Sequence, residues 1–434
     1  MEGIMRTAIS ARLAVPLCLF LNASAASAQA LRLDEAVQRA VESNPDLAAA
    51  RQQIVPLRER PAQRRSFAPP ILEAQAWQWP INTLNPANTN MFMLTASQDL
   101  SGRGKRQALT TLAERDVTVA EAAVKVQERD VVAAVTEHYW NLSIVRRQVA
   151  LRRAGLSLIR ELTDVAQARY ASGRTSQQDV LRGIVEATTI EADLLDLEQQ
   201  AAQATLRLNQ LMNRALDAPV GALDIPVESS LKASASDIEM LGNQFQPDVA
   251  VARATEARAE AQQFVARTAA TPEWAVGGGY MVQPRQTDAW TATISVTWPG
   301  APWSRRALSA QAAEATAAVS AARAGVTARQ QAARAAMAEA HLRIKSAERR
   351  AALVRTALLP QSRQALAVSQ VGYQADRADF AAVIDSERAL LLAELQYDQA
   401  LSDSRRALAD LERSVGAPIP AALLVPVNST EVPR

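Results

Sequence analysis

The chain has 434 residues, and its 47 basic side chains nearly balance its 45 acidic ones; because charges of both signs alternate along the chain, no nucleic-acid partner is expected. A single cysteine and two histidines argue against disulfides and against metal sites built from Cys or His, and we expect no cofactor. Aromatic residues make up only 4% of the chain, whereas the abundance of Ala, Leu, Gln, Glu and Arg favours long helices.

Residues 1–30 have the pattern of a secretory signal peptide. Basic residues precede the apolar run LAVPLCLFL, and small residues follow as far as Ala28-Gln29-Ala30. This pattern predicts cleavage before Leu31, with Ala26-Ser27-Ala28 as a second candidate site. Cys18 lies inside the expected signal, and lipid attachment there stays open. No later segment reaches the ~18 consecutive apolar residues of a membrane-spanning helix.

Several phrases occur twice, about 200 residues apart. NPDLAAAR at 44–51 returns as QPDVAVAR at 246–253, and RYASGRTSQQDVL at 169–181 corresponds to GYQADRADFAAVI at 372–384. The offset is nearly constant and far too long for a solenoid repeat. We therefore expect one large unit that is made twice.

Each unit has the same predicted order of elements. The first unit, 31–235, is expected to contain a half-helix at 34–65, two strands within 67–100, a long helix at 102–171, a half-helix at 175–213 and an equatorial linker at 214–235. The second unit, 236–434, is expected to contain a half-helix at 236–268, two strands within 272–299, a long helix at 304–371, a half-helix at 377–415 and a C-terminal tail at 416–434.

The helices carry the three-four apolar spacing of coiled coils. On the expected seams lie Val124, Val131, Val135, Leu142, Val145, Val149, Leu156, Leu194, Leu197, Ala201, Ala204, Leu208 and Leu211. His138 and Arg152 fall on the first long seam and weaken it. The summed lengths of the two half-helices match the long helix, so they are expected to lie end to end beside it. Pro360 predicts a kink in the second long helix.

Six of the seven tryptophans lie in or beside the expected strands. They are Trp77, Trp79, Trp274, Trp290, Trp298 and Trp303. Tryptophan concentrated on short strands is typical of the aromatic girdle of a transmembrane β-barrel, although two ordinary hairpins on a helical protein remain an alternative. A membrane barrel tolerates no open edge, and four strands cannot close a barrel. Three copies would supply twelve strands.

At this point the chain resembles the TolC-type outer membrane factor family over essentially its whole mature length. The shared marks are Asn44-Pro45-Asp46-Leu47, Gly104-Lys105-Arg106 and Tyr170-x-x-Gly173 followed by Asp179-Val180. The resemblance implies a mainly helical homotrimer with a twelve-stranded barrel in outer membrane lipid and a helical tunnel extending into the periplasm. It further implies two partners, a periplasmic adaptor (membrane fusion protein) and an inner-membrane transporter of the resistance-nodulation-division (RND) type. The C-terminal part resembles the heavy-metal efflux branch.

The resemblance also assigns residues to a constriction at the periplasmic tips of the helices. By position these are Asp179, Tyr373 and Asp385, with Arg377 as a basic partner. Asp376 stands where the family usually has a glycine. Three copies of Asp385 would form an acidic ring that concentrates cations; the alternative is that all of these are solvated turn residues.

The expected function is a passive export channel, and no enzyme activity is expected. Residues Gly277-Gly278-Gly279 lie in an expected strand and lack the following helix of a nucleotide site, so they are expected to permit a bend or close packing. Three alternatives stay open: the same channel serving multidrug efflux, the same channel serving type I protein secretion, and a soluble periplasmic coiled-coil adaptor.

Overall fold

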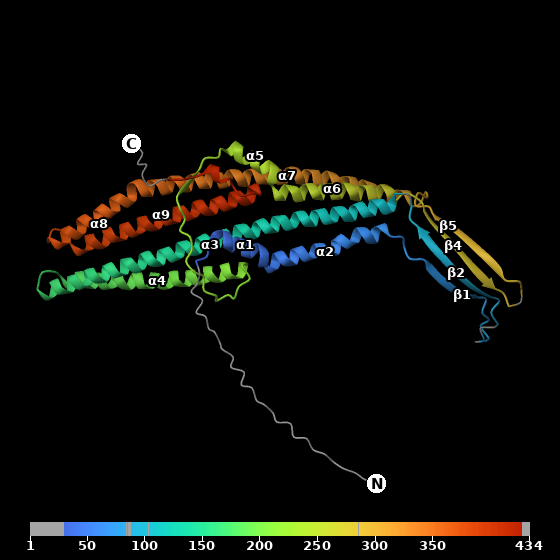
Figure 1. Ribbon diagram of the computed structural model, residues 1–434, viewed down its shortest axis with the longest axis horizontal. Coiled ribbons are helices and arrows are strands. Elements are labelled where there is room, and N and C mark those ends of the chain that lie inside the picture. The colour runs from blue at the N-terminus through green and yellow to red at the C-terminus, as the bar shows by residue number, and fades with distance from the viewer. Residues whose placement is uncertain (1–29, 84, 86–87, 103, 285, 428–434) are drawn as a thin grey trace, which may run out of the picture.

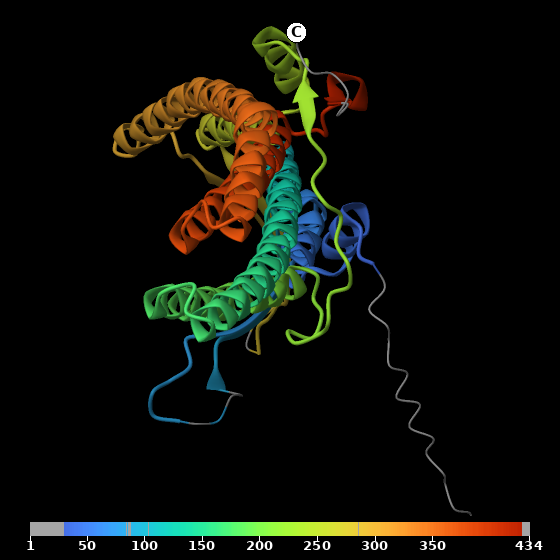
Figure 2. The same cartoon turned by 90° about the vertical axis from the view of Figure 1, so that its left-hand side faces the viewer.

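The computed structural model describes residues 30–83, 85, 88–102, 104–284 and 286–427. Most of the expected signal peptide, with Cys18, and the end of the expected C-terminal tail lie outside the described residues. The molecule is long and thin: helices run along most of its length, and a sheet lies at one end (Figure 1). Seen along the long axis, the helices form a curved wall (Figure 2).

The order helix, helix, strand, strand, long helix and further helix occurs in both halves. The first half contains α1 (Leu33–Ser43), α2 (Pro45–Arg65), β1 (Ile71–Trp77), β2 (Met91–Leu100), α3 (Lys105–Ala171) and α4 (Gln177–Leu211). The second contains α5 (Ala235–Phe245), α6 (Pro247–Thr268), β4 (Glu273–Val282), β5 (Ala289–Thr297), α7 (Arg305–Leu353), a π-helical turn (Val354–Leu358), α8 (Leu359–Gln374) and α9 (Phe380–Val415). Two short strands, β3 (Ser229–Leu231) and β6 (Leu424–Pro426), pair with one another.

The stretch expected as one helix over 34–65 is divided at Asn44. The Asn44 side-chain oxygen accepts hydrogen bonds from the backbone N–H groups of Asp46 (3.0 Å) and Leu47 (3.1 Å), which caps α2. Pro45 occupies the first position of α2, where a missing N–H costs no hydrogen bond. Asparagine followed by proline therefore starts a new helix here.

In each half, the break between the two short helices lies beside the end of a further helix, α4 in the first half and α9 in the second. The side-chain nitrogen of Asn44 donates to the carbonyl of Leu211, at the end of α4, over 3.1 Å. In the second half, the helix expected over 236–268 is divided at Gln246. The Gln246 side-chain nitrogen donates to the carbonyl of Ser414, near the end of α9, over 3.3 Å. Figure 1 shows α2 and α4 in succession along α3, and α6 and α9 in succession along α7.

The helices pack through the apolar seams that the heptads predicted. Buried seam residues are Val131, Val135, Leu142, Val145, Val149, Leu156, Leu194, Ala204 and Leu208. His138 and Arg152 are half-buried on the same helix. Because these seams follow the long helices, the buried core is spread along the molecule and is built from small aliphatic side chains. The chain can therefore fold with few aromatic residues. No helix within the described ranges combines the length and apolarity needed to cross a membrane.

The second long helix changes its winding immediately before Pro360. Proline lacks an N–H and collides with the carbonyl four residues earlier in a regular helix. The π-helical turn at Val354–Leu358 is wider than an α-helical turn, so the helix continues through Pro360 into α8. The axis of α8 is inclined to that of α7 (Figure 1), as the expected kink requires.

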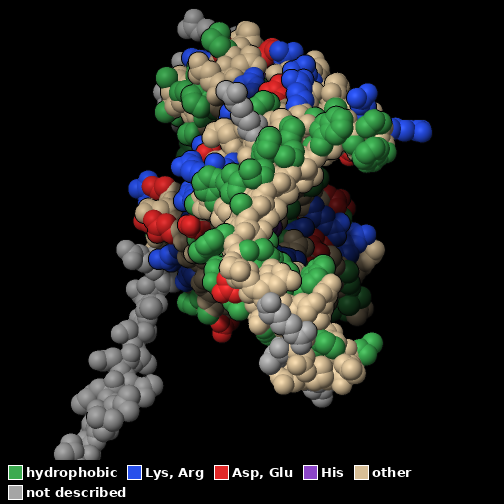
Figure 3. Space-filling model, turned by 90° about the vertical axis from the view of Figure 1, so that its right-hand side faces the viewer, with side chains coloured by type: hydrophobic (Ala, Val, Ile, Leu, Met, Phe, Trp, Pro, Cys, Tyr) green, Lys and Arg blue, Asp and Glu red, His purple; other side chains and the backbone are tan. Residues whose placement is uncertain are grey.

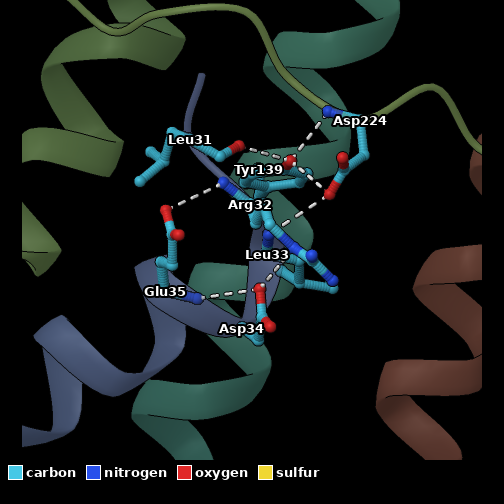
Figure 4. A network of polar contacts seen from close by, with 7 residues as sticks. All are labelled: Leu31, Arg32, Leu33, Asp34, Glu35, Tyr139 and Asp224. Carbon is cyan, nitrogen blue, oxygen red and sulfur yellow. Dashed lines mark hydrogen bonds and ion pairs between the residues drawn. The ribbon is translucent and has the colours of Figure 1, made fainter. Parts of the chain in front are cut away.

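The linker between the halves is fastened to helices of both. The Tyr139 hydroxyl on α3 lies 2.8 Å from the Leu31 carbonyl and 3.0 Å from the Asp224 carboxylate, and it accepts the Asp224 N–H at 2.8 Å (Figure 4). Burial raises the pKa of Tyr139, so its proton stays on the hydroxyl. Further along the linker, the Glu228 carboxylate accepts a hydrogen bond of 2.9 Å from Tyr397 on α9.

Candidate functional site

The helical tips turn through the same backbone conformation in both halves. After α3, Gly173 has φ 72°, and the N–H of Arg174 donates to the carbonyl of Arg169 at 2.9 Å. After α8, Asp376 has φ 55°, and the N–H of Arg377 makes the equivalent hydrogen bond at 2.8 Å. A left-handed residue at this position satisfies the last carbonyls of a helix. Asp376 therefore has the left-handed backbone conformation in which glycine is usually found.

Arg169 joins the first tip to the second. Its guanidinium donates to the carbonyls of Tyr373 (2.8 Å) and Gln374 (3.0 Å) and to the Asp376 carboxylate (2.7 Å). The guanidinium carbon also lies 4.6 Å from the centre of the Tyr373 ring. This contact therefore combines charge-assisted hydrogen bonds with a cation–π interaction.

Tyr373 is the buried member of the tip. Its side chain is 4% exposed, and its ring centre lies 5.5 Å from that of Phe380. Among the described residues, its hydroxyl has no hydrogen-bond partner. Burial raises the pKa of Tyr373, the positive charge of Arg169 opposes this rise, and the negative charge of Asp179 adds to it. Tyr373 is therefore neutral at physiological pH.

Asp179 lies in the first turn of α4, where a carboxylate is favoured by the unpaired N–H groups of the helix. It is half-buried and accepts a hydrogen bond of 2.5 Å from the Thr175 hydroxyl. Burial is the main reason why the pKa of Tyr373 in the second tip is raised, and the negative charge of Asp179 adds to that rise.

The other two expected tip residues lie apart from this cluster. Arg377 is exposed, and within the described residues its side chain forms no ion pair; the second tip's acid, Asp376, is paired with Arg169 instead. Asp385 is exposed on α9 and lines a groove of about 470 Å³ between α4 and α9. The guanidinium of Arg388 borders the same groove; its hydrogen bond with Glu186 is the main reason why its pKa is raised, and the charge of Asp385 adds to the rise.

Arg169 is the residue that sequence reasoning missed. Two features of the sequence could have pointed to it. An acid, Asp376, stands in place of the glycine at the second tip, and a base, Arg169, directly precedes Tyr170 at the first. Each feature alone is unremarkable on a helix surface, so only the spatial proximity of the two tips makes the pairing evident.

The four long strands form one antiparallel sheet with two chemically different faces. Its order is β1-β2-β4-β5, and strand alternation assigns each side chain to a face. One face carries Phe92, Leu94, Trp274, Val276, Tyr280, Val282, Trp290, Ile294 and Val296. The other carries mainly small and polar side chains, with Met93 and Met281 near one end: Thr95, Ser97, Gly277, Gly279, Thr291, Thr293 and Ser295. An apolar face opposite a small and polar one is typical of strands between lipid and water.

The six tryptophans in or beside the strands occur towards both ends of this sheet and are all well exposed, from 46% for Trp79 to 84% for Trp303. Trp290 packs edge-on against Tyr280 with ring centres 5.0 Å apart. Trp274 lies six residues from Tyr280 on the same strand, which corresponds to roughly 20 Å. The view from the sheet end shows hydrophobic side chains exposed on the surface (Figure 3).

Trp77 and Trp298 lie on different faces of the sheet. Trp77 pairs with Met91 and alternates with Gln75 and Glu73, so the register places it on the polar face. Trp298 follows β5 and alternates with Val296, which places it on the apolar side. Strand alternation therefore places the tryptophans of the expected girdle on both faces of the sheet.

The glycine run in β4 has a packing role. A Cβ on Gly279 would lie 2.5 Å from the Leu94 carbonyl oxygen and 2.6 Å from a methyl group of Thr95. The neighbouring strand is thus too close for a side chain there. As regards metals, the part of the chain that the structure describes contains no group of three or more His, Cys, Asp or Glu side chains suited to hold an ion.

Comparison with known proteins gives a consistent result. Residues 36–214 match the family described as outer membrane efflux protein. The cobalt-zinc-cadmium resistance protein CzcC of Cupriavidus metallidurans is 25% identical over 392 residues, which span 89% of this chain and 90% of CzcC.

Solved structures share the fold over nearly the same extent. The outer membrane protein VceC of Vibrio cholerae has a TM-score of 0.73 at 17% identity, covering 89% of this chain and 96% of VceC. CusC has a TM-score of 0.74 at 16% identity, covering 89% and 92%. The outer-membrane channel OprN has a TM-score of 0.73 at 19% identity, covering 89% and 90%. The family match over residues 36–214, the relative and the solved structures agree with one another, and the likeness to the solved structures shows that this chain shares their fold.

Proposed function

We propose that three copies of this chain form an outer-membrane exit duct that works with a periplasmic adaptor and an inner-membrane RND-type transporter to export heavy-metal cations. The duct would comprise a twelve-stranded barrel in the outer membrane and a helical tunnel in the periplasm. It would be passive, with no catalytic cycle, because the transporter would supply the energy.

The observation that carries this proposal is the sheet. Within the described residues, β1 and β5 each pair on one side only, and the sheet exposes one strongly apolar face. An open edge is not tolerated in lipid, and an apolar surface of this kind is unfavourable in water. Both problems disappear if β5 of one copy pairs with β1 of the next around a closed ring.

The helices provide edges suited to the same arrangement. At the tip end, α4 packs against α3 and α8 packs against α9, so α4 and α8 are the outermost helices of the wall. Both expose large apolar side chains: Leu181, Val185 and Leu195 on α4, and Val368 and Val371 on α8. A contact between unlike edges closes into a ring when the rotation is suitable.

A tandem duplication accounts for the equivalent positions of the two helix junctions. Asn44 contacts the end of α4 as Gln246 contacts the end of α9. The two tips also share their backbone turn. With two similar units per copy, three copies would place six similar units around the tunnel.

The metal assignment rests on the printed function of CzcC, a cobalt-zinc-cadmium resistance protein, and on the exposed position of Asp385. Three copies of Asp385 near the tip would attract cations, although Arg388 beside it would weaken the field. Multidrug efflux and type I protein secretion use the same architecture and are the competing functions. A soluble periplasmic adaptor is disfavoured because an exposed apolar sheet would be unfavourable for it.

A sensitivity panel on a deletion strain and its complemented parent tests the substrate class. Hypersensitivity confined to Cu, Ag, Zn, Co or Cd supports the metal assignment. Sensitivity to dyes and detergents with normal metal tolerance would keep the channel and remove the metal assignment. Single-channel recordings of Asp385→Ala test the acidic ring separately: cation selectivity should fall, and unchanged selectivity would remove Asp385 from the constriction.

A further inference from the structure

Two buried carboxylates lie on the neighbouring helices α4 and α9. Glu186 of α4 is 4% exposed and Glu387 of α9 is 5% exposed. Arg388 holds Glu186 with two hydrogen bonds, one of them 2.9 Å long from Nε. Glu387 has no such partner, and its Oε2 atom makes no hydrogen bond within the described residues. A buried carboxylate without a partner is costly when it is ionised.

The helix opposite is shaped to admit this carboxylate. A Cβ on Gly155 of α3 would lie 2.8 Å from Oε1 of Glu387. Glycine inside a helix costs about 1 kcal/mol relative to alanine, and here it leaves room for the acid. The contact between α3 and α9 is therefore built around Glu387.

The charged groups around Glu387 come from every neighbouring helix. Arg152 of α3 forms an ion pair with Asp193 of α4 at 3.1 Å, and Glu394 of α9 forms one with Arg363 of α8 at 3.5 Å. Burial is the main reason why the pKa of Glu387 is raised, and the charges of Glu186 and Glu394 raise it further. Arg152 and Arg388 oppose the rise.

A comparison along the same seam shows that burial of an acid does not by itself leave it unpaired. Asp398, also on α9, is 2% exposed, but its carboxylate accepts a 2.6 Å hydrogen bond from Arg147 of α3. Asp398 therefore has a direct counter-charge across the contact between the two halves of the chain. Glu387 lies against Gly155 instead, and the nearby charge of Glu186 adds to the rise of its pKa that burial causes.

We propose that Glu387 is a proton-operated lock between the two helical hairpins, α3–α4 and α8–α9. When neutral, it packs against Gly155 and holds α9 in place. When ionised, it is repelled by Glu186 and loosens the contact of α9 with α3 and α4. This inference goes beyond the proposed function and does not depend on which substrate is exported.

The sign of the pH dependence follows from the raised pKa. The packed state binds the Glu387 proton more tightly than a state in which α9 has moved away. Packing is therefore favoured most below the ordinary glutamate pKa, and this advantage is lost as the pH rises through the raised value. Acid should close the lock, and a higher pH should release it.

Distance measurements on the full-length assembled protein in lipid nanodiscs test the lock. Spin labels on cysteines introduced at Thr189 of α4 and Ala389 of α9, both exposed, report the separation of the hairpins. In the otherwise unsubstituted protein, we expect a short, narrow distance distribution at pH 5 and a longer, broader one at pH 8. Singly labelled protein supplies the background from neighbouring copies.

Two variants decide the outcome. Glu387→Gln keeps the shape of the neutral acid and should show the short distance at both pH values. Glu186→Gln removes a negative charge that raises the pKa of Glu387, so Glu387 should ionise at lower pH and without repulsion, and the lengthening between pH 5 and pH 8 should be smaller than in the parent. Asp196→Asn, on the exposed side of α4, is the matched control and should respond as the parent does. A distance that is independent of pH in the parent, or a Glu387→Gln protein that still responds to pH, would overturn the lock whatever the channel exports.

Discussion

The two helical tips have the same backbone and different chemistry. The first tip turns at Gly173, whose absent side chain would meet no atom within 4 Å, and its tyrosine, Tyr170, is 47% exposed. The second tip turns at Asp376, and its tyrosine, Tyr373, is buried. The comparison shows that a left-handed turn can be stabilised in two ways: glycine removes the strain, whereas aspartate accepts it and gains an ion pair with Arg169.

This difference makes the second tip dependent on the first. Arg169 belongs to α3, yet three of its hydrogen-bond acceptors lie in the second tip. The first tip receives no equivalent arginine within the described residues. Substitutions at matched positions of the two tips should therefore have unequal effects.

The largest effect is expected from Arg169→Ala. It removes two hydrogen bonds to carbonyls, the pair with Asp376 and the stacking on Tyr373, a loss of about 2–4 kcal/mol from charge-assisted contacts. The second tip should become mobile, which single-channel recordings would detect as higher or noisier conductance. The matched control is Arg174→Ala, at an exposed position of the first tip. Equal conductance of the two variants would contradict the role of Arg169.

A medium effect is expected from substituting the turn residues Gly173 and Asp376 one at a time. Gly173→Ala should destabilise the folded chain by about 1 kcal/mol through backbone strain alone. Asp376→Ala keeps the strain and loses the ion pair, so it should cost a similar amount. Asp376→Gly relieves the strain but loses a largely exposed ion pair worth at most about 1 kcal/mol, so it should be nearly neutral.

Thermal or denaturant unfolding of the three turn variants measures these differences. If Asp376→Gly proves as harmful as Asp376→Ala, the ion pair with Arg169 contributes more than the backbone strain. If Gly173→Ala is neutral, the strain argument fails for both tips.

The smallest effect is expected from removing the tyrosine hydroxyls. Tyr373→Phe eliminates a buried hydroxyl without a partner and should leave stability unchanged or raise it by up to about 1 kcal/mol. Tyr170→Phe, at an exposed site, should change stability by less than about 0.5 kcal/mol. A clear loss of stability in Tyr373→Phe would reveal an acceptor for its hydroxyl in the assembled channel.

Much of the fold follows from local patterns that the sequence displays directly. The coiled-coil seams could be predicted because apolar spacing on a long helix directly determines which residues are buried. The strands could be located from their tryptophans and the turn residues between them. The face occupied by Trp77 could not be predicted, because one residue of register moves a side chain to the opposite face.

The candidate site was harder to predict because it depends on contacts between residues about 200 positions apart. Arg169 and Asp376 look like ordinary surface charges until the two tips are side by side. Glu387 looks like any polar residue of an amphipathic helix, and only its contact with Gly155 shows that it is buried. Pro360 predicts a kink, but the π-helical turn that accommodates it has no signal in the local sequence.

The linker between the halves also holds the first and last described segments of the chain. Leu31 pairs with Leu223, and β6 pairs with β3 a few residues further along the same linker, so both ends of the described chain attach to one short segment. The order of the two halves along the polypeptide is therefore open to circular permutation: joining the present ends and cutting the linker would exchange the halves while preserving every contact of the wall. A permuted chain, with a signal peptide placed before the second half, should still assemble into stable oligomers; failure to assemble would show that the order of synthesis matters.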